Sequence, residues 1–149
     1  MRIAVAIDHA GVPLRETVLA AVRDGGHEAL DVGCRDDYPD TALDAARAIA
    51  GGEADRAIVV CGSGAGVSVA ANKLVGIRAS VCHDHYTAAQ CVVHDDCNVL
   101  CLGARVIGPA IAAELTAAFC AARFSGEERH VRRLNKILKM ERDGMEASP

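Results

Sequence analysis

The sequence has no tryptophan and very few other aromatic residues. Only two tyrosines and two phenylalanines occur among 149 residues, whereas hydrophobic residues make up 51% of the chain. The core must therefore be built from alanine, valine, isoleucine and leucine, and such side chains suit the closely packed layers of an α/β fold. A chain of this length can bury a substantial core, and we expect residues 1–149 to form a single domain.

Long hydrophobic runs and an excess of positive charge are also missing. No apolar stretch approaches the roughly 20 residues that span a bilayer, and the first residues do not follow the pattern of a signal peptide. The net charge of −4 and the isoelectric point of about 5.8 argue against bulk nucleic-acid binding. We therefore expect no membrane and no nucleic acid among the partners.

Paired cysteine motifs are absent, although the chain contains seven cysteines. None of them has the C-x-x-C spacing of a structural zinc site, and their number is odd. Cys61, Cys82 and Cys101 lie in or beside apolar runs, as buried free thiols often do. This usage predicts a reduced, cytoplasmic protein.

Short apolar runs alternate with helical segments along the whole chain. Strands are predicted at Arg2–Ile7, Ala29–Val32, the apolar run between Arg56 and Cys61, Ile77–Cys82 and Asn98–Leu102. Helices are predicted from Pro13 to Gly25, from Pro39 to Gly51, from the central glycines to Gly76, from His83 to about Val93, and over Pro109–Phe124 and Glu127–Arg142. A polar loop is predicted over Gly33–Tyr38, and a frayed tail over Gly144–Pro149.

This alternation predicts the fold class. Strands that alternate with helices form a parallel sheet with right-handed crossovers. We therefore expect an α/β protein with one doubly wound, Rossmann-like sheet of five parallel strands, helices on both faces and a C-terminal helical extension.

The stretch Arg56–Lys73 joins the central strand to the helix after it through Cys61-Gly-Ser-Gly-Ala-Gly66. Three glycines in five positions let the backbone turn sharply and approach a ligand closely. The following helix would direct free N–H groups into the loop, which favours anion binding, and would leave the thiol of Cys61 partly ionised near neutrality. Glycine-rich turns are nevertheless common in α/β proteins, and a buried cysteine can simply fill space.

Ligands of such sheets bind at the carboxyl ends of the strands. Side chains with useful chemistry follow the predicted strands at Asp8 and His9, Tyr38, Cys61–Gly66 and His83–His85. His94 and Asp95 come just before a strand, so they would join the same site only from a neighbouring subunit or through a fold-back.

Two familiar motifs fit poorly. The glycines of Gly62–Gly66 make G-x-G-x-G, one residue short of the dinucleotide fingerprint, although Asp84 lies at about the spacing of its ribose ligand. The run His83–His85 suggests a metal, but adjacent residues rarely converge on one ion, and helix capping by Asp84 is the expected role. We expect no metal site here.

Seven short segments, taken in order from Ile3 to about Arg133, resemble the type B ribose-5-phosphate isomerase and galactose-6-phosphate isomerase family. They are Asp8–Gly11, Asp37–Pro39, Cys61–Gly66, Ala70–Lys73, His94–Val99, Gly103–Gly108 and Arg129–Arg133. The resemblance implies aldose–ketose isomerisation of a phosphorylated sugar, without a metal or an organic cofactor. It also implies a homodimer, or two such dimers paired into a tetramer, with each site between two subunits.

The resemblance assigns roles to individual residues. Cys61 matches the catalytic base, Ser63 the hydroxyl that assists proton movement between O1 and O2, and His94 the group that opens the furanose ring. Some members instead carry a glutamate base six positions after Cys61, where Val67 stands. The implied substrate-binding residues are Asp8, His9, Tyr38, Gly62, Gly64, Gly66, Asp95, Arg105, Arg129 and Arg133, of which His9 and the three arginines match phosphate ligands.

One residue departs from the family pattern and leaves the substrate open. Many members have asparagine after the ring-opening histidine, whereas this chain has Asp95. A carboxylate there would repel an enediolate unless it is protonated or turned away. Ribose-5-phosphate is the favoured substrate, with allose, galactose or tetrose phosphates as alternatives. A non-catalytic module that binds a sugar phosphate or a nucleotide is the competing hypothesis.

Overall fold

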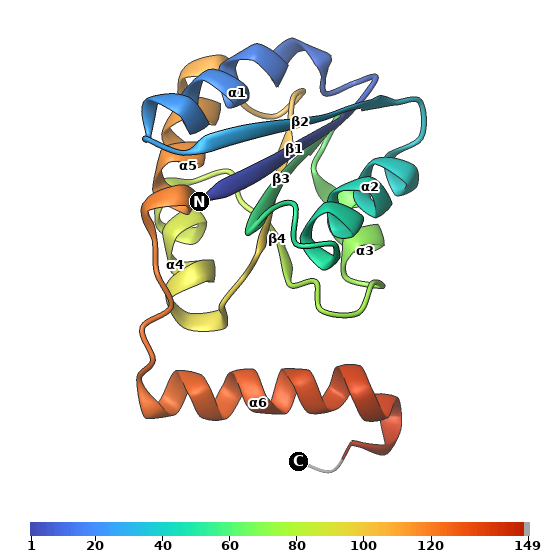
Figure 1. Ribbon diagram of the computed structural model, residues 1–149, viewed down its shortest axis with the longest axis vertical. Helices are drawn as coiled ribbons and strands as arrows, with labels where there is room; N and C mark the ends of the chain where they lie inside the picture. The colour runs from blue at the N-terminus through green and yellow to red at the C-terminus, as the bar shows by residue number, and fades with distance from the viewer. Residues whose placement is uncertain (148–149) are drawn as a thin grey trace.

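The computed structural model describes residues 1–147 (Figure 1). The strands are β1 (Arg2–Asp8), β2 (Glu28–Arg35), β3 (Arg56–Cys61), β4 (Ala79–Val81) and β5 (Val99–Gly103). The α-helices are α1 (Arg15–Asp24), α2 (Tyr38–Ala50), α3 (Ala65–Ala71), α4 (His85–Asp95), α5 (Pro109–Ala121) and α6 (Glu128–Asp143), with 3₁₀ turns at Val12–Leu14 and Gly144–Glu146. The end of the predicted frayed tail, residues 148–149, lies outside the described residues.

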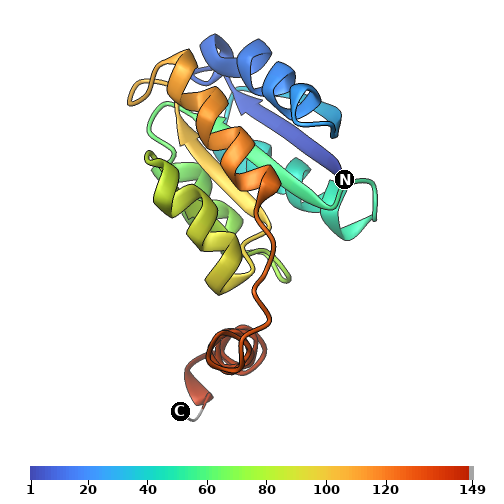
Figure 2. The same ribbon diagram turned by 90° about the vertical axis from the view of Figure 1, so that its left-hand side faces the viewer.

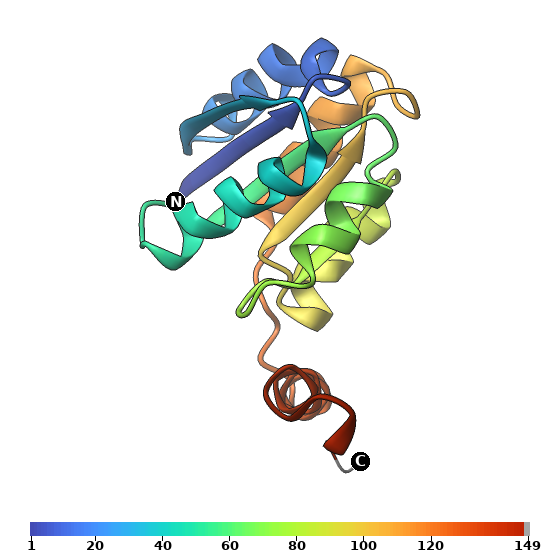
Figure 3. The ribbon, with the colours of Figure 1, turned by 90° about the vertical axis from the view of Figure 1, so that its right-hand side faces the viewer.

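All five strands are parallel and lie in the order β2-β1-β3-β5-β4. The chain goes from β1 to β2 at one edge and returns to β3 beside β1 (Figure 3). It then goes to β4 at the opposite edge and returns to β5 between β3 and β4. The topology therefore reverses between β1 and β3, where ligand crevices of such sheets form. The predicted doubly wound, five-stranded parallel sheet is confirmed.

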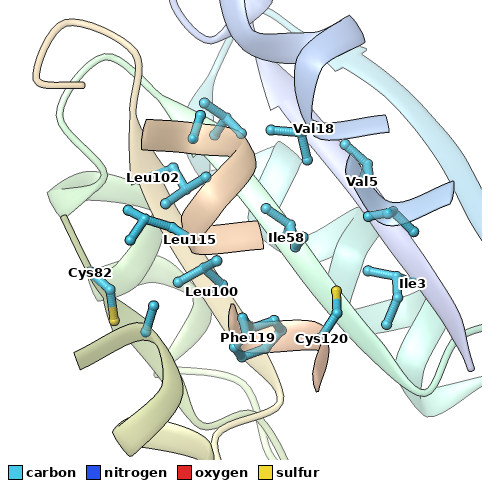
Figure 4. Packing of buried hydrophobic residues seen from close by; sticks show 14 of the residues in the cluster. Ile3, Val5, Val18, Ile58, Cys82, Leu100, Leu102, Leu115, Phe119 and Cys120 are labelled. Atoms are coloured by element: carbon cyan, nitrogen blue, oxygen red, sulfur yellow. The ribbon is translucent and has the colours of Figure 1, made fainter. Parts of the chain in front are cut away.

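The two faces of the sheet carry side chains of different size. In β1, Ile3, Val5 and Ile7 belong to one core cluster, whereas Ala4 and Ala6 belong to the other. Because successive side chains of a strand point to opposite faces, one face is bulky and the other is nearly flat. The bulky face packs against α1, α4 and α5, and Figure 4 shows part of this core.

The flat face is covered by α2 and α3. Helix α2 contributes the buried alanines Ala42, Ala45, Ala46 and Ala48. Alanine lets the backbone of a helix approach a sheet closely, so this layer is thin and excludes water without any aromatic side chain. The thin layer also brings the start of α2 close to the glycine-rich loop that follows β3.

Several element boundaries differ from those predicted. Strand β2 continues through Gly33, which was predicted to begin a loop, because a register shift opposite Val5 and Ala6 accommodates the glycine at φ 108°. Strand β4 is shorter than predicted and begins at Ala79.

Two helices end earlier than the sequence suggested. Helix α3 stops at Ala71, where the side-chain amide of Asn72 bonds Ser68 O at 3.0 Å and both backbone groups of Ala79 at 2.8 and 2.9 Å. Helix α5 stops at Ala121, because Arg56 and Arg123 donate to the carbonyls of its last turn.

Helix α6 stands apart from the α/β body, at the end of an extended segment over residues 122–127 (Figures 1 and 2). A hydrogen bond from the Gly76 N–H to Glu141 Oε1 at 2.8 Å links the helix to the body. The helix also exposes apolar side chains at Val131, Ile137, Leu138 and Met140. Across residues 1–147, no helix combines the length and the apolarity that crossing a membrane requires.

Candidate active site

A pocket of about 320 Å³ lies at the carboxyl ends of β1, β3 and β5. Most of the predicted site residues meet here, although they are widely separated in sequence. The lining residues are Asp8, His9, Ala10, Tyr38, Cys61, Gly62, Ser63, Gly66, Arg105 and Val106. The pocket therefore occupies the crevice between β1 and β3 that the topology predicts for a ligand.

Cys61 is the last residue of β3 and borders this pocket, although only 4% of its surface is exposed. The backbone N–H of Gly64 donates a hydrogen bond to Cys61 Sγ at 3.1 Å. Such a donor stabilises negative charge on sulfur. The loop thus holds the thiol in place at the border of the pocket.

The loop needs glycine at two of its positions. Gly64 has a φ of 79°, and a Cβ there would come within 2.7 Å of Val81 Cγ2. A Cβ on Gly66 would press on the ring of Tyr38 at 3.1 Å. Tyr38 begins α2, so its ring reaches the loop only because both elements share the thin, alanine-rich layer.

The other strand of the crevice provides Asp8 and His9. Asp8 is 4% exposed, and its Oδ1 accepts hydrogen bonds from the backbone N–H groups of Ala10 at 2.8 Å and Gly11 at 2.9 Å. This carboxylate therefore fixes the turn after β1. His9 is exposed, and its Nδ1 lies 2.8 Å from the carbonyl oxygen of Asp36, which leaves Nε2 available to a ligand.

Arg105 brings positive charge to the pocket. Its backbone N–H donates to Gly62 O at 2.9 Å, and its side chain lies over Gly62. Among residues 1–147, no carboxylate lies within ion-pair distance of this guanidinium. Ser63 is exposed at the same rim, with its Oγ accepting from Ala65 N at 3.3 Å. The pocket therefore offers a cation and a hydroxyl beside the thiol.

Five predicted residues do not line this pocket. Gly64 is part of the loop beside it, whereas four lie on other elements: His94, Asp95, Arg129 and Arg133. His94 and Asp95 end α4, which leads into the amino end of β5, whereas Cys61 pairs with Gly103 at the carboxyl end of β5. A strand rises about 3.3 Å per residue, so the length of β5 separates these groups. Arg129 and Arg133 are exposed on α6, and Arg129 pairs with Glu127 at 2.9 Å.

A larger hollow of about 800 Å³ lies between α6 and the body. Its wall comes from the segment after α3, from β4 and α4, and from the apolar side of α6. Of the predicted site residues, only Asp95 borders it. Its lining includes the thiols of Cys91 and Cys97 and the cations of Lys73 and Arg78. The smaller pocket, where eight of the predicted site residues meet, is the better candidate for catalysis.

The other cysteines do not line this pocket. The seven cysteines are all free, and only Cys34 is exposed. Burial raises the pKa of Cys120 to about 11, and burial likewise raises the pKa of Cys101 well above the usual range. A thiol with a raised pKa stays protonated near neutrality and is unreactive.

Other predictions about this region can be compared with the structure. Asp84 caps α4, since its Oδ1 accepts from Thr87 N at 2.8 Å, as expected. Val67 is fully buried in the core beneath the loop. Among residues 1–147, no group of three or more histidine, cysteine or acidic side chains is arranged to hold a metal ion.

Sequence reasoning gave no role to several residues at these sites. Ala10 and Val106 line the pocket, and both lie inside segments that carried the family resemblance. His130 stacks on His94, and Gln90 lies beside it. The spacing of four residues between Gln90 and His94 was a usable signal, because such residues share one side of a helix. The His130 contact joins two helices, and no local pattern predicts it.

The doubly wound fold and a pocket with a thiol, a hydroxyl and a guanidinium define a class of small parallel α/β proteins built to act on anionic ligands. The family model described as Ribose/Galactose Isomerase matches residues 3–137. The chain therefore belongs to the ribose/galactose isomerase family.

Individual relatives cover nearly the whole chain. Ribose-5-phosphate isomerase B of Escherichia coli is 41% identical, over 94% of this chain and 96% of that protein. D-erythrulose-4-phosphate isomerase 2 of Mycolicibacterium smegmatis is 37% identical, over 95% of this chain and 97% of that protein. The solved structure of Trypanosoma brucei type B ribose 5-phosphate isomerase superposes with a TM-score of 0.88 at 48% identity, covering 92% of this chain and 96% of that one.

Proposed function

We propose that the chain is an aldose–ketose isomerase that interconverts ribose-5-phosphate and ribulose-5-phosphate through an enediolate, with Cys61 as the base. The observation that carries the proposal is the thiol of Cys61, held by the Gly64 N–H at 3.1 Å in a pocket that also contains Ser63 and Arg105. We also propose that residues 1–149 act as one catalytic domain in the cytoplasm, without a metal or an organic cofactor.

The proposed reaction moves one proton between neighbouring carbons. The thiolate of Cys61 removes the proton from C2 of the open-chain aldose, and the carbonyl at C1 becomes part of the enediolate. Backbone N–H groups of the Gly62–Gly66 loop stabilise the charge on its oxygens, as in an oxyanion hole. Ser63 passes a proton between O1 and O2, and Cys61 returns its proton to C1 to give the ketose.

The phosphate of the sugar is proposed to bind at the cationic rim. Arg105 and His9 both line the pocket, while the carboxylate of Asp8 is held by backbone N–H groups of the turn after β1. A charge-assisted hydrogen bond from a guanidinium to phosphate is among the stronger polar contacts in proteins. In a dimer, Arg129 and Arg133 on the α6 helix of the neighbouring subunit would add two more such contacts.

A homodimer, or a tetramer of two such dimers, is part of the proposal. His94 lies near the amino ends of the strands, whereas Cys61 lies at their carboxyl ends. His94 can therefore serve catalysis only in the pocket of a partner. Helix α6 supports this assembly, because it stands apart from the body (Figure 1) and exposes four large apolar side chains. In the dimer, His94 of the partner subunit would open the furanose ring, while Tyr38 and Asp8 shape the pocket.

Asp95 bears on the choice of sugar. It follows His94 directly and would enter the same pocket of the partner. A carboxylate near O1 or O2 opposes the developing enediolate unless it is turned toward a hydroxyl of the substrate. The relatives named for ribose-5-phosphate and for erythrulose-4-phosphate make a pentose and a tetrose the first two sugars to compare.

The decisive experiment offers the purified protein a panel of sugar phosphates: ribose-5-phosphate, erythrose-4-phosphate, allose-6-phosphate and galactose-6-phosphate. Ketose formation is followed directly, and incorporation of deuterium from heavy water at the carbon of proton transfer is followed by NMR. We expect ribose-5-phosphate to give the highest kcat/KM. Cys61→Ser is the matched control, because it keeps the shape of the side chain and removes the thiolate.

Two results would contradict the proposal. Binding of sugar phosphates without any ketose or deuterium incorporation would indicate a non-catalytic module. Binding of NAD with no effect of sugar phosphates would favour a nucleotide-binding protein instead. Higher kcat/KM on a tetrose or hexose phosphate would keep the reaction and replace the substrate.

A further inference from the structure

Gln90 and His94 lie one turn apart on the same side of α4. The side-chain nitrogen Nε2 of Gln90 lies 2.7 Å from Nδ1 of His94. An amide nitrogen can only donate a hydrogen bond, so Nδ1 must accept it and carry no proton. A neutral imidazole without a proton on Nδ1 carries that proton on Nε2.

A second side chain, that of His130, packs against the face of the His94 ring. His130 stacks on His94 with ring centroids 4.1 Å apart and an angle of 27° between the planes. His130 is only 1% exposed, and its Nδ1 lies 2.6 Å from Ser125 Oγ. The backbone N–H of Ser125 donates in turn to Val93 O at 3.0 Å. The stack is therefore tied back to α4, which restricts rotation of the His94 ring.

We propose that Gln90 is a positioning residue for His94: its amide holds the neutral imidazole with the proton on Nε2, the nitrogen that is left free to meet the sugar. The inference rests on the proposed function, in which His94 of the partner subunit opens the furanose ring. Gln90 itself touches no reacting atom and acts only through His94.

The tautomer matters for one step of the reaction. Ring opening transfers one proton from the anomeric hydroxyl to the ring oxygen while the bond between C1 and that oxygen breaks. An Nε2–H beside the ring oxygen donates a hydrogen bond to it as negative charge develops there. The opposite tautomer would present a lone pair to the same oxygen and oppose the step. Proton transfer between C1 and C2 does not involve His94 and should not depend on Gln90.

Two variants of similar size separate the hydrogen bond from packing. Gln90→Met keeps the length of the side chain and removes the donor. Gln90→Glu provides an acceptor, which favours a proton on Nδ1 of His94. The first measurement is the ¹⁵N NMR signature of the histidine rings in the unliganded full-length protein, with His94 assigned by its loss in His94→Asn.

We expect the parent protein to show His94 with its proton on Nε2. Gln90→Met should give a mixture of tautomers, and Gln90→Glu should move the proton to Nδ1. Histidines far from α4, such as His9 and His27, should keep their signals and serve as internal controls. A proton on Nδ1 in the parent protein would overturn the inference whether or not the protein is an isomerase.

The second measurement compares a ring-forming substrate with one that cannot form this ring. On ribose-5-phosphate, Gln90→Met should lower kcat about tenfold with little change in KM, the effect expected when one hydrogen bond is lost from a step that limits the rate. On erythrose-4-phosphate, whose terminal oxygen carries the phosphate, the rate should stay near that of the parent. Equal losses on both substrates, or no loss on ribose-5-phosphate, would overturn the inference.

The same assay distinguishes failure of this inference from failure of the proposed function. If His94→Ala slows both substrates equally, the ring-opening role of His94 is wrong, and the positioning role of Gln90 falls with it. If His94→Ala slows only ribose-5-phosphate while Gln90→Met slows neither, the proposed function stands and the role of Gln90 is wrong.

Discussion

The backbone N–H of Gly64 donates to Sγ of Cys61 across 3.1 Å, within the turn that joins β3 to α3. The same turn leaves the sulfur at the border of the pocket, so one short loop both holds the thiol and presents it to a ligand.

Removing this thiol should nearly abolish isomerisation. Loss of a proton-transfer group lowers rates by about 10²–10⁴-fold, and the fully buried Val67 provides no carboxylate to replace it. We expect Cys61→Ala to keep its fold and its affinity for sugar phosphate, as measured by circular dichroism and calorimetry. An alanine variant with half of the parent turnover would contradict the assignment.

Alkylation should single out Cys61 among the buried thiols. Cys34 is exposed, whereas Cys101 and Cys120 are buried and have raised pKa values. In a Cys34→Ser background at about pH 8, iodoacetamide should modify Cys61 first, and sugar phosphate should protect it. Peptide mass spectrometry reads the site directly. Modification of Cys101 or Cys120 at a comparable rate would show that the pocket does not favour Cys61.

The arginines of α6 should act on substrate affinity. Arg129→Ala and Arg133→Ala should each remove a charge-assisted contact worth roughly 1.5–3 kcal/mol, which raises KM by about 10- to 100-fold. Arg142→Ala is the matched control, because Arg142 is exposed on the same helix and its position in the helical repeat puts it on the side opposite to that pair. If all three variants bind inorganic phosphate as tightly as the parent, Arg129 and Arg133 are ordinary surface charges.

Subunit mixing should test whether His94 works in a partner's pocket. Cys61→Ala and His94→Ala proteins should each be nearly inactive on ribose-5-phosphate. A mixed dimer contains one complete pocket, made of Cys61 from one chain and His94 from the other. Statistical exchange should recover about a quarter of the parent activity if the pockets are independent. The absence of recovery, with exchange verified by native mass spectrometry, would mean that the two residues do not cooperate across subunits.

Acid should destabilise the protein partly through His130. Burial lowers the pKa of His130 below its usual value of 6.5, with the nearby charge of His94 acting in the same direction. As the pH falls, His130 therefore binds a proton more readily in the unfolded chain than in the native chain. The free energy of unfolding then decreases as the pH drops below about 6.5. Urea unfolding near pH 7 and near pH 5 should show a smaller fall for His130→Gln than for the parent. His27, whose pKa is also lowered by burial, should account for part of what remains.

Much of the fold was determined by sequence pattern alone. The alternation of short apolar runs with helical segments predicted the parallel sheet, and residues such as Pro39 and Asp84 indicated where helices begin. These signals are local, because strand burial, helix capping and glycine turns depend on neighbours within a few residues. The sequence also predicted the candidate site at Cys61–Gly66, because its thiol, its hydroxyl and its glycine loop are contiguous in the chain.

Tertiary structure alone decided how distant residues combine. Asp8, Tyr38 and Arg105 meet Cys61 only because the topology reverses between β1 and β3. The early end of α5 depends on Arg56, which comes from a strand far along the chain. The stack of His130 on His94 depends on the path of the extended segment before α6. Such contacts join positions that no short window of sequence relates, so packing rather than pattern determines them.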